Sequence, residues 1–93
     1  METIQNAKIK FSYLGVDEEG TPVFQLGFEC RSGFTLVTEK RELVDVAFLA
    51  EILNTLEVRS WEELPRKFAR VKTNENKKVV EIGNLIEDKW VRI

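Results

Sequence analysis

Alternation of apolar and polar residues near the N-terminus constrains the fold of this chain more than any other feature. Between Ala7 and Leu14, the side chains of Ile9, Phe11 and Tyr13 share one face of an extended segment, while lysine and serine side chains share the other. A period of two residues is typical of a strand with one buried face. The segment therefore predicts a β-strand whose apolar face includes all three residues.

Two further strands are expected before any helix. In the second, residues 23–30, apolar side chains alternate with polar or small ones and are predicted to share one face; they are Phe24, Leu26, Phe28 and Cys30. Gly27 has no side chain to pack, which indicates a bulge or the close approach of another backbone. After a turn at 31–33, residues 34–37 are compatible with a short third strand. The first part of the chain therefore predicts a three-stranded antiparallel meander.

One long helix is expected from Glu39 to Leu56, with Thr38 as its N-cap. Its apolar residues fall on two sides. The first stripe suffices to cover one face of a sheet and consists of Leu43, Val46, Ala47, Ala50 and Leu53. The second contains Val44, Phe48, Leu49 and Ile52. A continuous apolar patch of this kind usually marks an interface, and a twofold axis lets one patch cover itself. The sequence predicts a homodimer through this stripe, with burial under the C-terminal strands as the alternative.

The remainder of the chain predicts a one-turn helix and further strands. Ser60-Trp61-Glu62-Glu63 matches a capping box, in which the Ser60 hydroxyl accepts from the Glu63 N–H and the Glu63 carboxylate reaches back. Pro65 then ends the helix near Trp61. Strands are expected at 67–72, 78–82 and 88–93. The fold class is α+β: an antiparallel sheet, made of the meander plus two or three C-terminal strands, packed on one long helix. Ninety-three residues suit a single domain spanning 1–93.

Composition argues against an enzyme. The chain has no histidine and one cysteine, which removes His-based acid–base and nucleophilic sites and any cysteine-rich metal site. Cys30 continues the apolar alternation of its strand and is interpreted as a small buried residue. The carboxylates cluster locally, in turns and at a helix cap, where solvated charge is the expected state. We expect no catalytic residue, no metal and no cofactor.

A turn offers the first candidate binding site. Arg31, Ser32 and Phe34 surround Gly33 and bring a cation, a hydroxyl and an aromatic ring together. This combination predicts a site for a small anionic or nucleotide ligand, although an ordinary hairpin turn has the same composition.

A basic segment offers the second candidate site. It contains Arg66, Lys67, Phe68, Arg70 and Lys72 and continues to Lys77 and Lys78. Cations interleaved with an aromatic ring are typical of surfaces that bind single-stranded nucleic acid. The net charge of −2 argues against this interpretation, and solvated strand edges explain the lysines equally well.

The C-terminal third resembles a group of small uncharacterised proteins of tailed phages and prophages. The matching segments are Ser60-Trp61-Glu62-Glu63-Leu64-Pro65-Arg66-Lys67-Phe68-Ala69-Arg70-Val71 and Glu81-Ile82-Gly83-Asn84-Leu85-Ile86-Glu87-Asp88-Lys89-Trp90, and Ile52–Val58 is also similar. Arg66 stands where these proteins usually have glycine, and their Gly-rich aromatic loop is reduced here to residues 31–34. The resemblance implies a phage or prophage origin and action in the cytoplasm of a host bacterium.

These observations together predict a small phage accessory protein that binds rather than catalyses. It would inhibit or sequester a host component, for example one of antiviral defence, and its partner would be a host or phage protein or a small anionic ligand. The alternative is a nucleic-acid-associated protein that uses the basic segment 66–78. No apolar run approaches 18 residues and the N-terminus has no apolar signal core, so we expect a cytoplasmic location without membrane contact.

Overall fold

A computed structural model describes residues 2–93 as one curled antiparallel sheet with a short helix. The elements are β1 (Thr3–Val16), β2 (Pro22–Cys30), β3 (Thr35–Val37), β4 (Arg41–Glu42), α1 (Ala47–Leu56), the 3₁₀ turn η1 (Trp61–Glu63), β5 (Phe68–Thr73), β6 (Val79–Gly83) and β7 (Trp90–Arg92). The strand order is β3-β2-β1-β5-β6-β7, and β4 also pairs with β2. All pairs are antiparallel, so the predicted α+β class and antiparallel sheet are confirmed.

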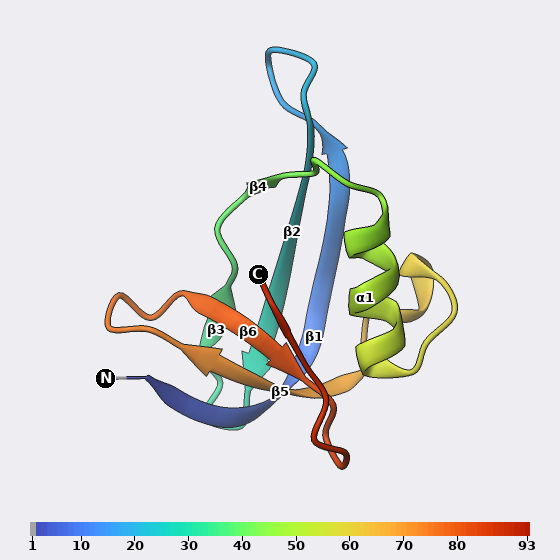
Figure 1. Cartoon of the computed structure of the whole chain (residues 1–93). Coiled ribbons are helices and arrows are strands. Elements are labelled where there is room, and N and C mark those ends of the chain that lie inside the picture. The colour runs from blue at the N-terminus through green and yellow to red at the C-terminus, as the bar shows by residue number, and fades with distance from the viewer. Residues whose placement is uncertain (1) are drawn as a thin grey trace.

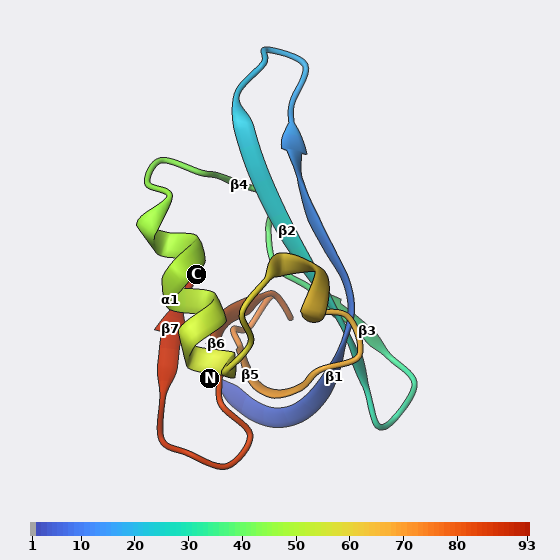
Figure 2. The same ribbon diagram turned by 90° about the vertical axis from the view of Figure 1, so that its right-hand side faces the viewer.

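Strand β1 joins the two halves of the sheet. Its N-terminal part pairs with β5 and its C-terminal part pairs with β2, and Ala7 lies opposite both Cys30 and Ala69. Figures 1 and 2 show the long, bent ribbon of β1 and the way the strands curl around an interior, with α1 standing on one side. The concave face of this curled sheet holds the core.

The core draws on every major strand and on α1. The side chains exposed by 2% or less include Ile9, Phe24, Leu26, Phe28, Ile52, Leu56, Leu64, Ala69, Val71 and Ile82. The predicted inward face of β2 is therefore confirmed. Trp61, half-buried in η1, packs against the same cluster. The predicted one-turn helix near Trp61 is also confirmed.

A β-bulge changes the predicted face of β1. The register with β2 shifts between Ile9 and Phe11, so Lys10 is the extra residue. Ile9 is buried, whereas Phe11 and Tyr13 are 37% and 40% exposed and lie on the opposite face. The prediction that all three share one buried face is therefore wrong beyond Ile9. A strict two-residue alternation cannot reveal an inserted residue.

Helix α1 begins at Ala47, eight residues later than predicted. Residues 38–43 run instead along the edge of β2. The Thr38 hydroxyl accepts from the Leu26 N–H at 3.1 Å, and the Leu43 N–H donates to the Pro22 carbonyl at 2.8 Å. Thr38 is completely buried and does not cap the helix. Pairing with β2 also creates β4, so the sheet has seven strands rather than the expected five or six.

The predicted capping box at Ser60 forms differently. The Ser60 side chain makes no cap hydrogen bond, and the Glu63 Oε2 atom accepts from the backbone N–H of Arg59 at 2.9 Å. Glu63 still satisfies a backbone donor at the start of η1, one residue earlier than the pattern predicts.

No helix among residues 2–93 has the length and apolar character needed to cross a membrane.

Candidate ligand-binding groove

The β2–β3 turn is one wall of a surface cavity. The Cys30 N–H donates to the Phe34 carbonyl and the Gly33 N–H donates to the Cys30 carbonyl, both at 2.9 Å. Gly33 has φ +90°, a left-handed conformation that glycine adopts without steric cost. The tight turn leaves the Phe34 ring 73% exposed. A large apolar ring is thus held on a rigid turn and open to solvent.

The β5–β6 turn is the opposite wall. The Asn74 side-chain oxygen accepts from the N–H groups of Asn76 at 2.9 Å and Lys78 at 3.1 Å, and the Lys77 N–H donates to the Asn74 carbonyl at 3.0 Å. These bonds fix the turn in the way asparagine commonly does. Two ammonium groups, those of Lys77 and Lys78, therefore come from an ordered turn.

The groove between the turns has a volume of about 540 Å³. Ser32 and Phe34 line it from one turn, and Asn74 to Lys78 line it from the other. The sheet adds three polar residues to the lining: Thr3, Gln5 and Thr73. The two turns are far apart in the chain, and the curl of the sheet brings them to the same opening.

The sequence predicted only part of this groove. Ser32 and Phe34 line it, but Arg31 lines a neighbouring cavity of about 440 Å³ together with Lys8, Glu29 and Phe68. The three predicted ligand residues are therefore split between two cavities. The sequence assigns Lys77 and Lys78 to the basic segment. Their position opposite Phe34 depends on the pairing of β5 with β6, which local sequence does not reveal.

Cys30 lines both cavities but lacks the features of a nucleophile. Its side chain is buried, and burial raises the pKa of its thiol above the ordinary value, so the neutral form is favoured. Among residues 2–93, no three histidine, cysteine or acidic side chains are grouped so that they could hold a metal ion. The residues that line the groove carry two ammonium groups, hydroxyls, amides, one aromatic ring and the carboxylate of Glu75.

Two cations of the basic segment, Arg70 and Lys72, already interact with other groups of the chain. The Arg70 guanidinium donates to the carbonyls of Asn84 at 2.7 Å and Glu87 at 2.8 Å and lies 4.7 Å from the Trp90 ring centre. Lys72 forms an ion pair with Glu81 at 2.9 Å. Phe68, Arg70 and Lys72 share one face of β5, and the two cations bind groups of the sheet and of the loop that follows β6.

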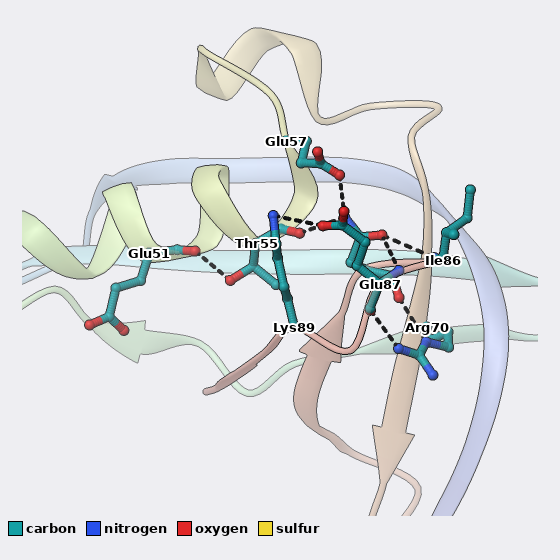
Figure 3. A network of polar contacts seen from close by, with 8 residues as sticks. Glu51, Thr55, Glu57, Arg70, Ile86, Glu87 and Lys89 are labelled. Atoms are coloured by element: carbon teal, nitrogen blue, oxygen red, sulfur yellow. Dashed lines mark hydrogen bonds and ion pairs between the residues drawn. The ribbon is translucent and has the colours of Figure 1, made fainter.

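Residues 81–90 form a polar corner beside α1. Asn84 is buried, and its side-chain nitrogen donates to the Thr55 carbonyl at 2.9 Å and to the Glu57 carboxylate at 2.8 Å. Its side-chain oxygen accepts from the N–H groups of Ile86 and Glu87, both at 3.0 Å. Figure 3 shows how Thr55, Glu57, Arg70 and Glu87 converge at this corner. Its hydrogen bonds join the end of α1 to the sheet.

Trp90 lies at the same corner and is not part of the hydrophobic core cluster. It lies opposite Gly83 in the β6–β7 pair, and a methyl group built on Gly83 would come within 2.7 Å of the indole. The indole N–H donates to Asp88 at 3.0 Å. The aromatic ring therefore needs a glycine beneath it.

The four residues predicted as a dimer interface do not form one exposed patch. Ile52 is fully buried, and the Phe48 ring packs against Phe24 with 5.5 Å between ring centres. Leu49 is half-buried, and Val44, 87% exposed, precedes the helix. The second stripe of the predicted helix is therefore largely covered within the chain.

Comparison with known proteins gave no match: no family model, curated protein or solved structure is similar to this chain.

Proposed function

We propose that this chain is a non-catalytic binding protein that holds a small anionic ligand with a flat ring, of the nucleotide class, in the groove between its two turns. The observation that carries the proposal is the placement of an exposed aromatic ring opposite two lysines across one cavity. The volume of about 540 Å³ is within the range of small-molecule sites.

Each side of the groove suits one part of such a ligand. The exposed ring of Phe34 offers a surface on which a planar base can stack. Lys77 and Lys78 offer ammonium donors to a phosphate, and Ser32 adds a hydroxyl on the other wall. A nucleotide carries both chemistries on one molecule, whereas inorganic phosphate or a nucleoside carries only one.

Sequestration fits these groups better than turnover. The chain has no histidine, and the one thiol is held in its neutral form. The resemblance to phage and prophage proteins supports action in the cytoplasm of a host bacterium. In that setting the protein would bind a nucleotide-type ligand and so prevent a host component, for example one of antiviral defence, from binding it.

The nucleic-acid alternative has weaker support. Arg70 and Lys72 already bind carbonyl groups, an aromatic ring and a carboxylate of this chain. Phosphate contacts from the segment would have to come from Arg66 and Lys67 and from Lys77 and Lys78, and the last two already line the groove. Such binding would weaken steeply with added salt because phosphate contacts release counterions.

Titration calorimetry with adenosine diphosphate, inorganic phosphate and adenosine tests the proposal. We expect the diphosphate to bind most tightly, because it alone engages both walls. Phe34→Ala and Lys78→Ala should each weaken its binding by about tenfold, the size expected for loss of one charged or stacking contact. Phe68→Ala and Lys67→Ala are matched controls, since these residues lie outside the groove, and should leave affinity unchanged.

Two results would overturn the proposal. One is the absence of any binding of the diphosphate at millimolar concentration. The other is equal loss of affinity in the groove variants and in the control variants, which would place the ligand elsewhere.

A further inference from the structure

The β1–β2 hairpin projects beyond the body of the protein with one edge uncovered. In Figure 1 it extends above the rest of the chain, away from β5 and β6. β5 borders β1 only from Thr3 to Lys8, and backbone bonds to Arg66 and Lys67 end this contact at Ile9. From Lys10 to Val16, no other strand among residues 2–93 lies on that edge of β1.

The backbone groups on this edge can be assigned from the register. The Asp17 N–H donates to the Thr21 carbonyl at 3.0 Å, and antiparallel pairs alternate between bonded and non-bonded along the strands. Val16 is therefore in a non-bonded pair, which agrees with its partner Pro22 lacking an N–H. The same alternation directs the N–H and C=O groups of Ser12, Leu14 and Val16 toward the open edge.

The open edge lacks the usual protection against pairing. Native edge strands are commonly blunted by proline or by charged side chains. Between Phe11 and Val16 there is neither, and the exposed fractions of Leu14 and Val16 are 46% and 60%. A hydrophobic strand with free backbone donors and acceptors is a template for a further strand.

Opposite charges lie at the two ends of this edge. Glu18 and Glu19 occupy the tip of the hairpin, where their side chains are exposed. Arg66 and Lys67 lie where β5 approaches Ile9, at the other end. Within the described chain, no hydrogen bond or ion pair engages these four side chains. An identical strand running in the opposite direction would bring each acidic tip to a basic end.

We propose that a second copy of this chain pairs with the open edge of β1 about a twofold axis, forming a sheet that is continuous through both copies. Identical antiparallel strands related by such an axis keep the same face on the same side. With Leu14 opposite Leu14 of the second copy, Ser12 lies opposite Val16, and all three residues with free backbone groups form bonded pairs. In this register the tip with Glu18 and Glu19 reaches Arg66 and Lys67 of the second copy.

This interface replaces the helix face predicted from the sequence. Phe48 and Ile52 are occupied in packing within the chain. The β1 edge supplies the self-complementary surface that the helix does not. The interface is also independent of the ligand groove, because Leu14 and Val16 are absent from the groove lining. Loss of dimerisation and loss of ligand binding can therefore be measured separately.

Sedimentation of the wild type and of Leu14→Lys tests the pairing. We expect a dimer at about 100 µM for the wild type and a monomer for the variant, because like charges directly opposite each other destabilise strand pairing. Ile4→Lys is the matched control: Ile4 is in the same strand and 54% exposed, but β5 already covers its edge. It should remain a dimer. A monomeric wild type, or a dimeric Leu14→Lys variant, would overturn the proposal. A monomeric wild type would mean that the edge is open to a strand of a different protein.

A charge exchange tests the register. Glu18→Lys and Arg66→Glu should each weaken the dimer by about tenfold, since two symmetric contacts become repulsive. The double variant Glu18→Lys/Arg66→Glu restores opposite charges and should recover most of the affinity. Circular dichroism of each variant checks that the fold is intact. Additive losses in a folded double variant would contradict this register.

Discussion

At the scale of single residues, the backbone of Arg66 is strained. Arg66 has φ +77°, in the left-handed region that glycine favours. The arginine therefore holds a strained conformation that a glycine would adopt freely, at a cost of about 1 kcal/mol.

Arg66→Gly is expected to raise the free energy of unfolding by about 0.5–1 kcal/mol, because relief of left-handed strain exceeds the added entropy of the unfolded chain. Urea denaturation at low micromolar concentration, where the monomer prevails, measures this change. Lys67→Gly, at a neighbouring position without positive φ, should instead lower it. Equal destabilisation by both substitutions would contradict the role of backbone conformation.

A second residue-scale feature is the contact between Phe11 and Gly27. The two residues pair across β1 and β2, and a methyl group built on Gly27 would lie 2.0 Å from the Phe11 ring. The sequence indicated a bulge or a close approach at Gly27. The structure has a bulge in the partner strand, and the ring of Phe11 lies over the glycine.

Gly27→Ala is therefore expected to have opposite effects in two backgrounds. In the wild type it should destabilise the fold by about 1–2 kcal/mol, because the Phe11 ring must move. In a Phe11→Ala background it should be neutral or stabilising by about 0.5 kcal/mol, since alanine suits a strand better than glycine. Thermal unfolding of the wild type, of each single variant and of the double variant measures the four stabilities needed for this comparison. The same sign in both backgrounds would show that the ring contact is unimportant.

At the scale of elements, the polar corner around Asn84 joins the C-terminal end of α1 to the sheet. Asn84→Ala removes four side-chain hydrogen bonds, one of them to the buried carbonyl of Thr55 and two from part-buried backbone N–H groups. We expect a loss of about 2–4 kcal/mol in the free energy of unfolding, measured by urea denaturation.

Asn76→Ala is the control for this substitution, because Asn76 lies exposed in the β5–β6 turn. Its effect should stay within about 0.5 kcal/mol. If the two substitutions cost the same, the Asn84 network contributes nothing specific to the attachment of α1.

The elements also show which predictions a single sequence supports. The alternation in β2 and the Pro65 stop after η1 are local signals, and the structure confirms both. The helix pattern from Glu39 was also local, but the Thr38 hydroxyl and the backbone of Leu43 bond to β2. Pairing with a strand distant in sequence overrode the local helical pattern in residues 39–46.

At the scale of the whole molecule, the curl of the sheet determines what the surface can bind. β1 serves both halves of the sheet, so the turns after β2 and β5 come to the same opening. Phe34 could be identified from the sequence as an exposed aromatic residue in a turn. Its alignment with Lys77 and Lys78 depends on this tertiary arrangement, which no local pattern contains.

The groove makes the most direct test of this account a titration of isotope-labelled protein with adenosine diphosphate, followed by amide chemical shifts. We predict saturable shifts confined to residues 32–36 and 73–78, the two walls of the groove. Residues 66–72 should change little, because their cations are either engaged within the chain or distant from the groove. Saturable shifts in 66–72 with none in the two turns, or no shifts at millimolar ligand, would contradict the proposed binding function.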